Sequence, residues 1–269
     1  IENELVKVNG IVITKPSYKT KINDVIEYEI LPEKTLEICP ENILLNILYE
    51  DDDILIVDKE RGMVVHPSNG HYSGTLVNAI MYHCKDSLST INGVIRPGIV
   101  HRIDKDTSGV LCICKNNNSH QNISLQFANH TNVRKYKAIV KGYIKNDTDT
   151  IDLPIGRDKN NRLRMAVVSN GKRAITKYKV LKRYNNYTYI DLELLTGRTH
   201  QIRVHMSHIG HPLLGDLTYG RNDKLFPKLT GQILHAYYLK LVHPTTNIDM
   251  EFERDLPKYF TEVLNKLDE

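Results

Sequence analysis

Between positions 135 and 141 the chain alternates apolar and basic residues, and this pattern constrains the fold more than any other feature of the sequence. The apolar members are Tyr136, Ala138 and Val140, and the basic members are Lys135, Lys137 and Lys141. A period of two predicts a β-strand with one buried face, which places the ring of Tyr136 on the inside. The same alternation returns at Thr188, Ile190, Leu192 and Leu194, so a second strand of this kind is predicted.

Helical spacing interrupts the strands at a few places. Residues 75–84 carry apolar side chains at helical intervals, and a short helix is expected after Gly197. Residues 116–128 and 258–267 are further helix candidates. No internal repeat or low-complexity segment is visible. Strands mixed with a few helices predict an α+β fold with a mainly antiparallel, mixed β-sheet flanked by helices.

A carboxylate lies just ahead of a predicted buried strand. Asp104 precedes a Thr-Ser-Gly sequence at 107–109, and the apolar run 110–113 follows. The pattern predicts a polar turn that leads into a buried strand, with Asp104 on the rim of a rigid scaffold, where functional carboxylates are often found. The local pattern also allows a simpler role, in which Asp104 or Asp106 caps the turn through a hydrogen bond between its side chain and the backbone.

The composition is ordinary for a globular protein. With 269 residues, of which 41% are hydrophobic, the chain can bury a sizeable core as one large domain or two smaller ones. The formal net charge of +4 permits an RNA partner without requiring one, because basic surface acts through local clustering. No apolar run reaches the about 18 residues that cross a bilayer, and no signal sequence opens the chain. We therefore expect a cytoplasmic protein without a membrane partner.

The cysteines and histidines do not predict a metal site. The 4 cysteines contain no C-x-x-C pair, and free thiols in a reducing compartment explain them. A cluster of histidines invites a zinc interpretation, because two of its members could share a helix face. We expect no bound metal, since no carboxylate or thiolate lies beside them at ligand spacing. The four histidines are His200, His205, His208 and His211.

The amino-terminal residues have a pattern of their own. Short β-like pieces flank Asn9-Gly10, and an Asn-Gly pair between apolar residues is a strong signal for a hairpin. Residues 1–31 resemble the second half of an S4 RNA-binding domain, whose first half, with its pair of helices, is absent. The chain opens at Ile1 without a methionine. We therefore expect a partial S4-like domain in a piece of a longer protein.

Five blocks of the chain stand in an order that matches a known enzyme family. Residues 101–109 read HRIDKDTSG, residues 135–142 read KYKAIVKG, and residues 195–205 read LTGRTHQIRVH. The blocks 210–216 and 234–236 follow them. Together they resemble the nucleophile motif, the tyrosine strand, the arginine motif and the later blocks of the RluA/RluD-type pseudouridine synthases. Ordered blocks are far more specific than any single motif.

The resemblance implies the pseudouridine synthase fold, with a catalytic domain at 47–269. Residues 32–46, which contain Pro32 and Pro40, are predicted from their own sequence to form an extended linker. It implies that the chain converts specific uridines to pseudouridine in RNA, as a monomer acting on a stem-loop of 23S-type, large-subunit ribosomal RNA. The reaction breaks the N1–C1′ bond, rotates the uracil and forms a C5–C1′ bond without a change in oxidation state. We therefore expect no metal and no small-molecule cofactor.

By the resemblance, Asp104 is the catalytic carboxylate. A carboxylate can act at an oxocarbenium-like anomeric carbon; attack on the sugar, attack on uracil C6 and elimination all remain open. Arg203 would keep Asp104 ionised and orient it through a two-pronged hydrogen bond. Tyr136 would stack on the uracil, and its hydroxyl or a nearby water would take the C5 proton. From the residues alone, Arg203 could also be an ordinary surface arginine on a helix, and Tyr136 could be a core tyrosine of the sheet.

Three further residues are assigned to the substrate. In the family an arginine occupies the space that the extruded uridine vacates, which corresponds to Arg102. By the same resemblance His101 supports the loop, and Leu234 packs against the uracil. Phosphate contacts are expected from the basic runs 134–141, 157–164 and 172–173.

Three other classes of protein fit parts of the pattern. A non-catalytic RNA-binding protein would share the fold and tolerate the loss of Asp104. A glycosidase or nucleoside hydrolase would need a second carboxylate as its acid, for which Asp106 is the nearest candidate. A metallohydrolase would use the four histidines and lose activity to chelators.

Overall fold

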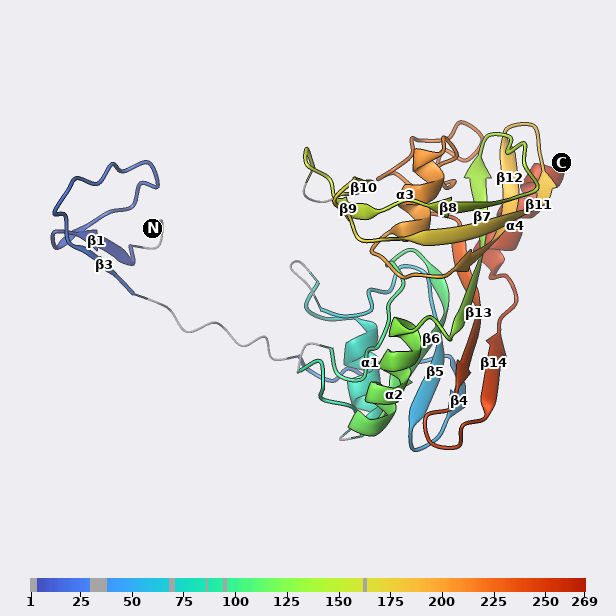
Figure 1. The fold of residues 1–269 in the computed structure, drawn as a ribbon, viewed down its shortest axis with the longest axis horizontal. Helices are drawn as coiled ribbons and strands as arrows, with labels where there is room; N and C mark the ends of the chain where they lie inside the picture. The colour runs from blue at the N-terminus through green and yellow to red at the C-terminus, as the bar shows by residue number, and fades with distance from the viewer. Residues whose placement is uncertain (1–3, 30–37, 68–70, 86, 94–95, 162–163) are drawn as a thin grey trace. The chain divides into compact units, whose positions relative to one another are not determined.

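The computed structural model describes residues 4–29, 38–67, 71–85, 87–93, 96–161 and 164–269. The chain divides into two compact units, Ile1–Glu37 and Ile38–Glu269. Figure 1 shows the second unit as a long twisted sheet with helices packed against it. No helix in the described ranges is long and apolar enough to cross a membrane.

The first unit contains the hairpin that the Asn-Gly pair predicts. Strand β1 (Val6–Val8) pairs antiparallel with β2 (Ile11–Val12) and, on its other side, with β3 (Ile26–Tyr28). Asn9 and Gly10 both have positive φ angles, 52° and 77°, as a tight hairpin turn requires. The prediction of a hairpin is confirmed.

Residues 38–46 belong to the second unit, although the sequence predicts that they continue the linker. Ile38 is buried in the main core, and the side-chain amide of Asn78 donates to the carbonyl of Cys39 at 2.8 Å. The packed unit therefore begins at Ile38, ahead of the expected boundary at residue 47. Residues 32–37 of the expected linker lie outside the described residues.

The second unit is built on one sheet, which among the described residues has nine strands in the order β4-β5-β6-β13-β7-β12-β11-β8, with β14 paired to β13. The strands are β4 (Ile47–Glu50), β5 (Ile54–Lys59), β6 (Ser108–Cys114), β7 (Val133–Lys141), β8 (Thr148–Asp152), β11 (Ile175–Arg183), β12 (Tyr187–Leu194), β13 (Leu234–Val242) and β14 (Asp249–Glu253). Neighbouring strands are antiparallel except for the pair β6 and β13. The prediction of a mainly antiparallel, mixed sheet is confirmed.

In the described ranges four helices cover the sheet, and two of them start at residues that cap the helix with a side chain. Helix α1 (Leu76–Cys84) begins after Thr75, and α2 (Asn117–Ala128) begins after Asn116; each of these residues caps the helix with its side chain. Helix α3 (Gln201–His208) follows His200, and α4 (Lys258–Asp268) ends near the carboxyl terminus. All four lie where the sequence predicts helices.

The helices divide the core between two faces of the sheet. The apolar residues of α1 and α3 share one cluster with Tyr136 and Leu234, whereas Ile123 of α2 and Phe260 of α4 pack in two other clusters. In Figure 1, α1 lies beside the end of the sheet that holds β5, and α3 lies beside the end that holds β8 and β11. The face with Tyr136 is therefore bordered by α1 and α3.

One feature of the fold has no sequence-based prediction. Strands β9 (Ile155–Arg157) and β10 (Met165–Val167) form a separate antiparallel pair. Helix α3 contacts β10, and Val204 of α3 shares a small apolar cluster with Ile155. This pair therefore supports α3 from the side away from the main sheet.

Candidate active site

Asp104 lies on a tight turn that leads into β6. The main-chain N–H of Thr107 donates to the carbonyl of Asp104 at 3.1 Å, so the turn spans residues 104–107. The sequence predicts this turn three residues later, at the Thr-Ser-Gly sequence, but Ser108 already begins the strand. The prediction was wrong because the polar residues Thr107 and Ser108 are buried and bonded across the sheet.

Gly109 explains why the strand starts so early. Strands β6 and β13 run parallel here, with Gly109 opposite Ala236, and Gly109 has a φ angle of +125°. A Cβ at this position would lie 2.1 Å from the carbonyl oxygen of Ala236. Only glycine allows the two backbones to approach so closely, and this approach places Leu234 beside the Asp104 turn.

Arg203 joins Asp104 to a second carboxylate. Its Nη1 donates to Oδ2 of Asp104 at 3.0 Å, while Nε and Nη2 donate to the two oxygens of Asp216 at 2.7 and 3.0 Å. The two-pronged hydrogen bond that was expected at Asp104 is therefore made by Arg203 to Asp216, and Asp104 accepts a single hydrogen bond from Arg203. Asp216 is fully enclosed and also accepts from the main-chain N–H groups of Thr218 and Tyr219. The geometry leaves the second oxygen of Asp104 free to face the chamber.

The ion pairs fix the charge of Arg203. Burial alone would lower the pKa of this guanidinium, but the hydrogen bonds to Asp216 and the charge of Asp104 outweigh it and raise the pKa above its usual value. Arg203 is therefore a permanent cation with carboxylates on two sides. The Asp104 side chain is 17% exposed, so it stays reachable from the chamber.

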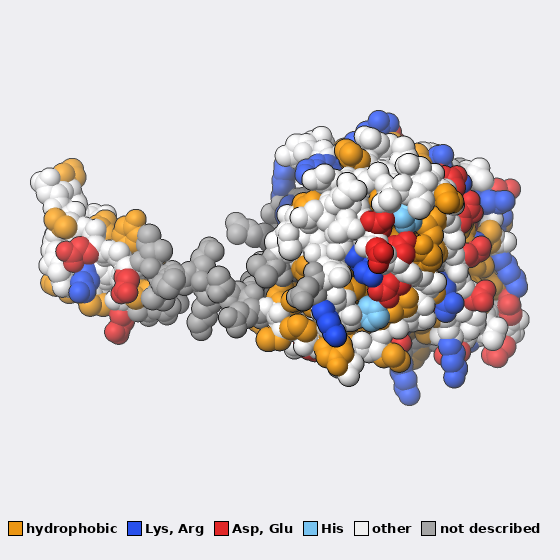
Figure 2. Space-filling model, turned by 90° about the horizontal axis from the view of Figure 1, so that it is seen from below, with side chains coloured by type: hydrophobic (Ala, Val, Ile, Leu, Met, Phe, Trp, Pro, Cys, Tyr) orange, Lys and Arg blue, Asp and Glu red, His pale blue; other side chains and the backbone are white. Residues whose placement is uncertain are grey.

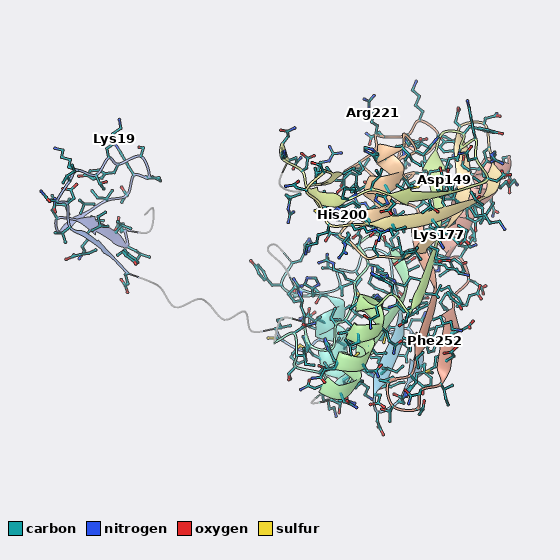
Figure 3. The ribbon with its side chains drawn as sticks, viewed as in Figure 1. Lys19, Asp149, Lys177, His200, Arg221 and Phe252 are labelled. Atoms are coloured by element: carbon teal, nitrogen blue, oxygen red, sulfur yellow. The ribbon has the colours of Figure 1, made fainter. Side chains whose placement is uncertain are left out.

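His200 is a further neighbour of Asp104 to which the sequence assigns no catalytic role. Burial lowers its pKa against the opposing charge of Asp104, so the imidazole is neutral near pH 7. The main-chain N–H of Met165 donates to the Tyr219 hydroxyl at 2.9 Å, which leaves that hydroxyl to donate to Nδ1 of His200 at 2.8 Å. The imidazole proton then lies on Nε2, 3.8 Å from Oδ1 of Asp104. Figure 3 shows His200 between the end of the sheet near α3 and the end near α1 and α2.

Asp104 opens into a small space that we call the inner chamber. Its volume is about 50 Å³, so it holds one or two waters and must widen to admit a pyrimidine. Four of the predicted site residues line it beside Asp104, and burial raises the pKa of Tyr136, so its hydroxyl is protonated near pH 7. Its walls include Asp104, Arg102, Tyr136, Leu194, Arg203 and Leu234.

A larger space, the outer cleft, adjoins the inner chamber and shares Asp104 and Tyr136 with it. Its volume is about 410 Å³. Arg102 is exposed between the two spaces, and its Nη1 donates to Nε2 of His66 at 3.3 Å. Burial, together with the charges of Arg102 and Arg96, lowers the pKa of His66 to about 4, so His66 is a neutral acceptor.

His101 ties the turn to the sheet. Its Nε2 accepts from the main-chain N–H of Cys112 at 2.9 Å, and its ring stacks on Phe127 with a centroid distance of 4.5 Å. Burial and the charge of Arg134 lower the pKa of His101 to about 3, which suits an acceptor. His101 thus holds the segment before Asp104 against β6 and α2.

Lys59 is a buried support that the sequence does not reveal. It is 2% exposed, and its Nζ donates to the carbonyls of Glu60, Met63 and Lys105 at 2.7, 2.8 and 3.1 Å. One side chain therefore holds the loop after β5 and the Asp104 turn together. A lysine at the end of an apolar strand gives no such signal in a single sequence.

The histidine cluster is dispersed among other partners. His205 bonds to Thr176 and to the carbonyl of Leu153, and His211 bonds to the carbonyl of Lys141. Among the described residues no group of three or more His, Cys, Asp or Glu side chains has an arrangement that could hold a metal ion.

The distribution of carboxylates bears on the hydrolase alternative. In the described part of the chain, Asp104 is the only carboxylate that lines the inner chamber or the outer cleft. Asp106 instead lies against the backbone at Gly231, where a Cβ would come within 2.8 Å of its Oδ2. The described residues therefore do not supply the second acid that a two-carboxylate glycosidase needs.

The basic runs differ in their availability for phosphate. Lys137 pairs with Asp191 at 3.2 Å, Lys141 with Asp223 at 2.9 Å, and Arg173 with Asp152 at 2.9 Å. Figure 2 shows one face of the second unit with a group of acidic side chains near its centre, so that face is not a continuous basic surface. Arg134 belongs to the same run, lines the outer cleft and has no ion pair among the described residues.

These features suit chemistry on a planar ring. An anionic oxygen, a fixed cation, a tyrosine ring and an apolar leucine converge on one small chamber, and a wider cleft gives access to it. The six residues that the sequence assigns to the site all line these two spaces. Among the described residues, Asp104 is the one carboxylate that this arrangement offers.

Comparisons with known proteins agree with this site. Residues 53–208 match the RNA pseudouridylate synthase family. The chain is 48% identical over 267 residues to an uncharacterized RNA pseudouridine synthase of Bacillus subtilis. The aligned region covers 99% of this chain and 87% of that protein. It is 44% identical over 257 residues to ribosomal large subunit pseudouridine synthase D of Zymomonas mobilis, with coverages of 93% and 81%.

A solved structure carries the same fold. Human RNA pseudouridylate synthase domain containing 1 superposes with a TM-score of 0.63 at 25% identity, over 84% of this chain and 95% of that one. The chain therefore belongs to the RNA pseudouridylate synthase family, and it is an enzyme of that class. The predicted family, fold and reaction class are confirmed.

Proposed function

We propose that this enzyme isomerises specific uridines to pseudouridine in large-subunit ribosomal RNA, in the cytoplasm, as a monomer that recognises a stem-loop. The observation that carries the proposal is the Asp104 carboxylate, held by Arg203 in a chamber that Tyr136 and Leu234 line. The choice of RNA is supported by the ribosomal relative from Zymomonas mobilis, which is similar along most of both chains. The S4-like unit at 1–31 would add RNA contacts.

In this proposal Asp104 is the residue that acts on the nucleoside. Its single bond to Arg203 leaves oxygen lone pairs for the anomeric carbon or the uracil, while Arg203 and Asp216 keep the carboxylate in one orientation. The N1–C1′ bond breaks, the uracil turns, and C5 forms a new bond to C1′. C5 then loses its proton and N1 gains one. Any bond that the Asp104 carboxylate formed on the way is broken again, so the reaction consumes nothing.

Tyr136 and Leu234 would bind the uracil from two sides. Because burial keeps the Tyr136 hydroxyl protonated, we assign this ring a stacking role and give the C5 proton to a water in the outer cleft. The pyrimidine must first leave the RNA stack, at a cost of a few kcal/mol. Arg102 is exposed at the mouth of the chamber, where it would occupy the vacated position in the RNA.

Mapping of pseudouridines tests the proposal in cells. Carbodiimide labelling of ribosomal RNA from cells that lack this protein should show one or more sites lost from the large subunit. Wild-type protein and Asp106→Asn should restore them, whereas Asp104→Asn should not. Asp106→Asn is a matched control because it makes the same chemical change two residues away and outside the chamber. An unchanged set of large-subunit sites would contradict the proposed substrate.

A further inference from the structure

Arg134 is a buried cation that has no counter-ion in the part of the chain that the structure describes. It lies on β7 two residues before Tyr136, on the same face of the sheet, and is 7% exposed. No ion pair or hydrogen bond to Arg134 exists among the described residues, and its Nε is sealed from solvent with no partner. Burial lowers the pKa of the guanidinium, which nonetheless stays charged at neutral pH because its intrinsic pKa is so high.

A buried charge with no partner is costly, and proteins rarely retain one without a use. A neighbouring lysine on β7 shows the usual solution. Lys137, on the opposite face of the strand, pairs with Asp191 at 3.2 Å. Arg134 instead faces the outer cleft and has no carboxylate partner among the described residues.

The surroundings of Arg134 are shaped to hold its guanidinium in place. The ring of Phe127 lies 5.2 Å from the guanidinium carbon, a cation–π distance. On the other side, a Cβ at position 197 would lie 2.7 Å from Nη1, so Gly197 leaves the space that the guanidinium fills. The glycine of the Leu-Thr-Gly-Arg sequence therefore has a specific task, which is to admit Arg134 to the wall of the cleft.

The charge of the whole cleft points to an anionic ligand. Arg102, Arg198 and His130 line it together with Arg134, and the carboxylate of Asp104 lies at its inner end. Burial, together with the charges of Arg134 and Arg198, lowers the pKa of His130. A space of about 410 Å³ is large enough for more than a single ion.

We propose that Arg134 binds a backbone phosphate of the RNA beside the uridine that enters the inner chamber. This inference rests on the proposed function, because it takes RNA as the source of the anion. The guanidinium has a planar fork of donors that matches two phosphate oxygens, and the phosphate supplies the counter-ion that the described residues do not provide. Because the outer cleft and the inner chamber share Asp104 and Tyr136, this phosphate belongs to the target nucleotide or to one next to it.

Two variants test the site from opposite sides. Arg134→Met removes the charge and keeps most of the apolar volume against Phe127. Gly197→Ala keeps the charge but pushes the guanidinium out of its place. Arg254→Met is the matched control, since it removes an arginine that lines neither space and pairs with Asp58. Asp104→Asn serves as a background in which binding is measured without turnover.

RNA affinity is the first measurement, made by titration of a transcribed large-subunit ribosomal RNA fragment over a range of salt concentrations. Arg134→Met should bind about 10- to 100-fold more weakly, as expected for loss of a hydrogen-bonded charge pair. The slope of log K for RNA binding against log salt concentration should become shallower by about 0.7 to 0.9 in this variant, as expected for one lost phosphate contact. Gly197→Ala should shift affinity in the same direction, and Arg254→Met by less than about threefold. Unchanged affinity and slope in Arg134→Met would overturn the proposal.

Inorganic phosphate is the second probe, and it needs neither RNA nor turnover. At constant ionic strength, phosphate in place of chloride should raise the melting temperature of the wild-type protein and of Arg254→Met, but not that of Arg134→Met. An equal rise in all three proteins would place the anion elsewhere and would also overturn the proposal. If Arg134→Met fails to fold, the same two measurements are made on Gly197→Ala, which should also bind RNA more weakly and lose the stabilisation by phosphate.

The two proposals can fail separately. In one outcome the wild-type protein converts no uridine in ribosomal RNA, yet phosphate stabilises the wild-type protein and not Arg134→Met. The proposed substrate is then wrong and the anion site stands. If conversion occurs and Arg134→Met binds RNA as wild type does, the anion site is wrong and the proposed function stands.

Discussion

Arg203 and Arg134 are equally buried, at 7% exposure each, and both border the spaces around Asp104, yet they are held in opposite ways. Arg203 has a carboxylate on each side, whereas Arg134 lies beside an aromatic ring and a glycine and has no ion pair among the described residues. Because Arg203 is already paired, it can keep Asp104 fixed before any substrate binds. Arg134 is unpaired among the described residues, so it remains available to bind an anion.

The difference assigns separate tasks to the two regions. The region around Arg203 is complete without RNA, which is the condition for a preorganised reactive group. The wall around Arg134 becomes complete only with RNA in place. Changes near Arg203 should therefore affect stability and chemistry, and changes near Arg134 should affect binding.

The largest effect is expected at Asp104. Asp104→Asn should lower the rate of pseudouridine formation by about 10⁴-fold or more, because it removes the only carboxylate that the described residues bring to the chamber. RNA affinity should stay within a few-fold of wild type, since the wall of the cleft is intact. Single-turnover assays and binding titrations on the same RNA measure both quantities. Conversion at the wild-type rate would remove Asp104 from the mechanism.

A stability difference should separate the two arginines. Arg203→Met leaves Asp216 as a buried, unpaired charge, which should cost about 3–5 kcal/mol of unfolding free energy. Arg134→Met removes a charge that has no partner and should leave stability equal or higher. Urea unfolding of both variants beside wild type gives the comparison. A comparable loss in the two variants would show that Arg134 is also a structural cation.

Acid should weaken the support of the Asp104 turn. The folded pKa values of His101 and His66, about 3 and about 4, lie below the ordinary value of 6.5, so below pH 6.5 the unfolded chain binds these protons first. Unfolding free energy should therefore fall as the pH drops from about 6.5, by up to about 1.4 kcal/mol per pH unit for each histidine. Urea unfolding at a series of pH values measures this slope.

A matched pair of variants isolates His101. His101→Gln keeps an acceptor for the Cys112 N–H but cannot titrate, so it should make the slope shallower by about one proton. His208→Gln, at an exposed position, should leave the slope unchanged. An unaltered slope in His101→Gln would contradict the assignment of a neutral, buried imidazole.

The smallest effect is expected at Arg102. Because this side chain is exposed, Arg102→Ala should change unfolding free energy by less than about 0.5 kcal/mol. Turnover on a paired stem-loop should fall about tenfold, since the few kcal/mol needed to extrude the uridine are no longer partly offset. On an unpaired oligonucleotide the deficit should shrink. Equal deficits on both RNAs would argue against a role in extrusion.

Local features of the fold could be predicted from the sequence. The alternation around Tyr136 and the helix candidates at 75–84 and 116–128 each depend on a few neighbouring positions, and the structure contains the corresponding elements. The parallel pairing of β6 with β13 could not be predicted, because it brings Ser108 against His235, far along the chain. The turn at Asp104 was misplaced because burial of the next residues depends on that same pairing.

The site shows the same limit. Asp104 and Arg203 were brought together by resemblance, and the structure bears out their contact, but the two-pronged bond goes to Asp216. In the sequence, Asp216 is only the last residue of the block 210–216, and nothing there indicates that it pairs with Arg203. The isolation of Arg134 is even less visible, since the absence of a counter-ion is a property of everything folded around it.

The most direct test of this division of tasks is a structure of the enzyme bound to its RNA. We predict that a uridine is turned out of the stack, with its uracil between Tyr136 and Leu234, its ribose beside Asp104, and a flanking phosphate within hydrogen-bonding distance of Arg134. A complex in which the uridine stays stacked, or in which no phosphate contacts Arg134, would contradict the account.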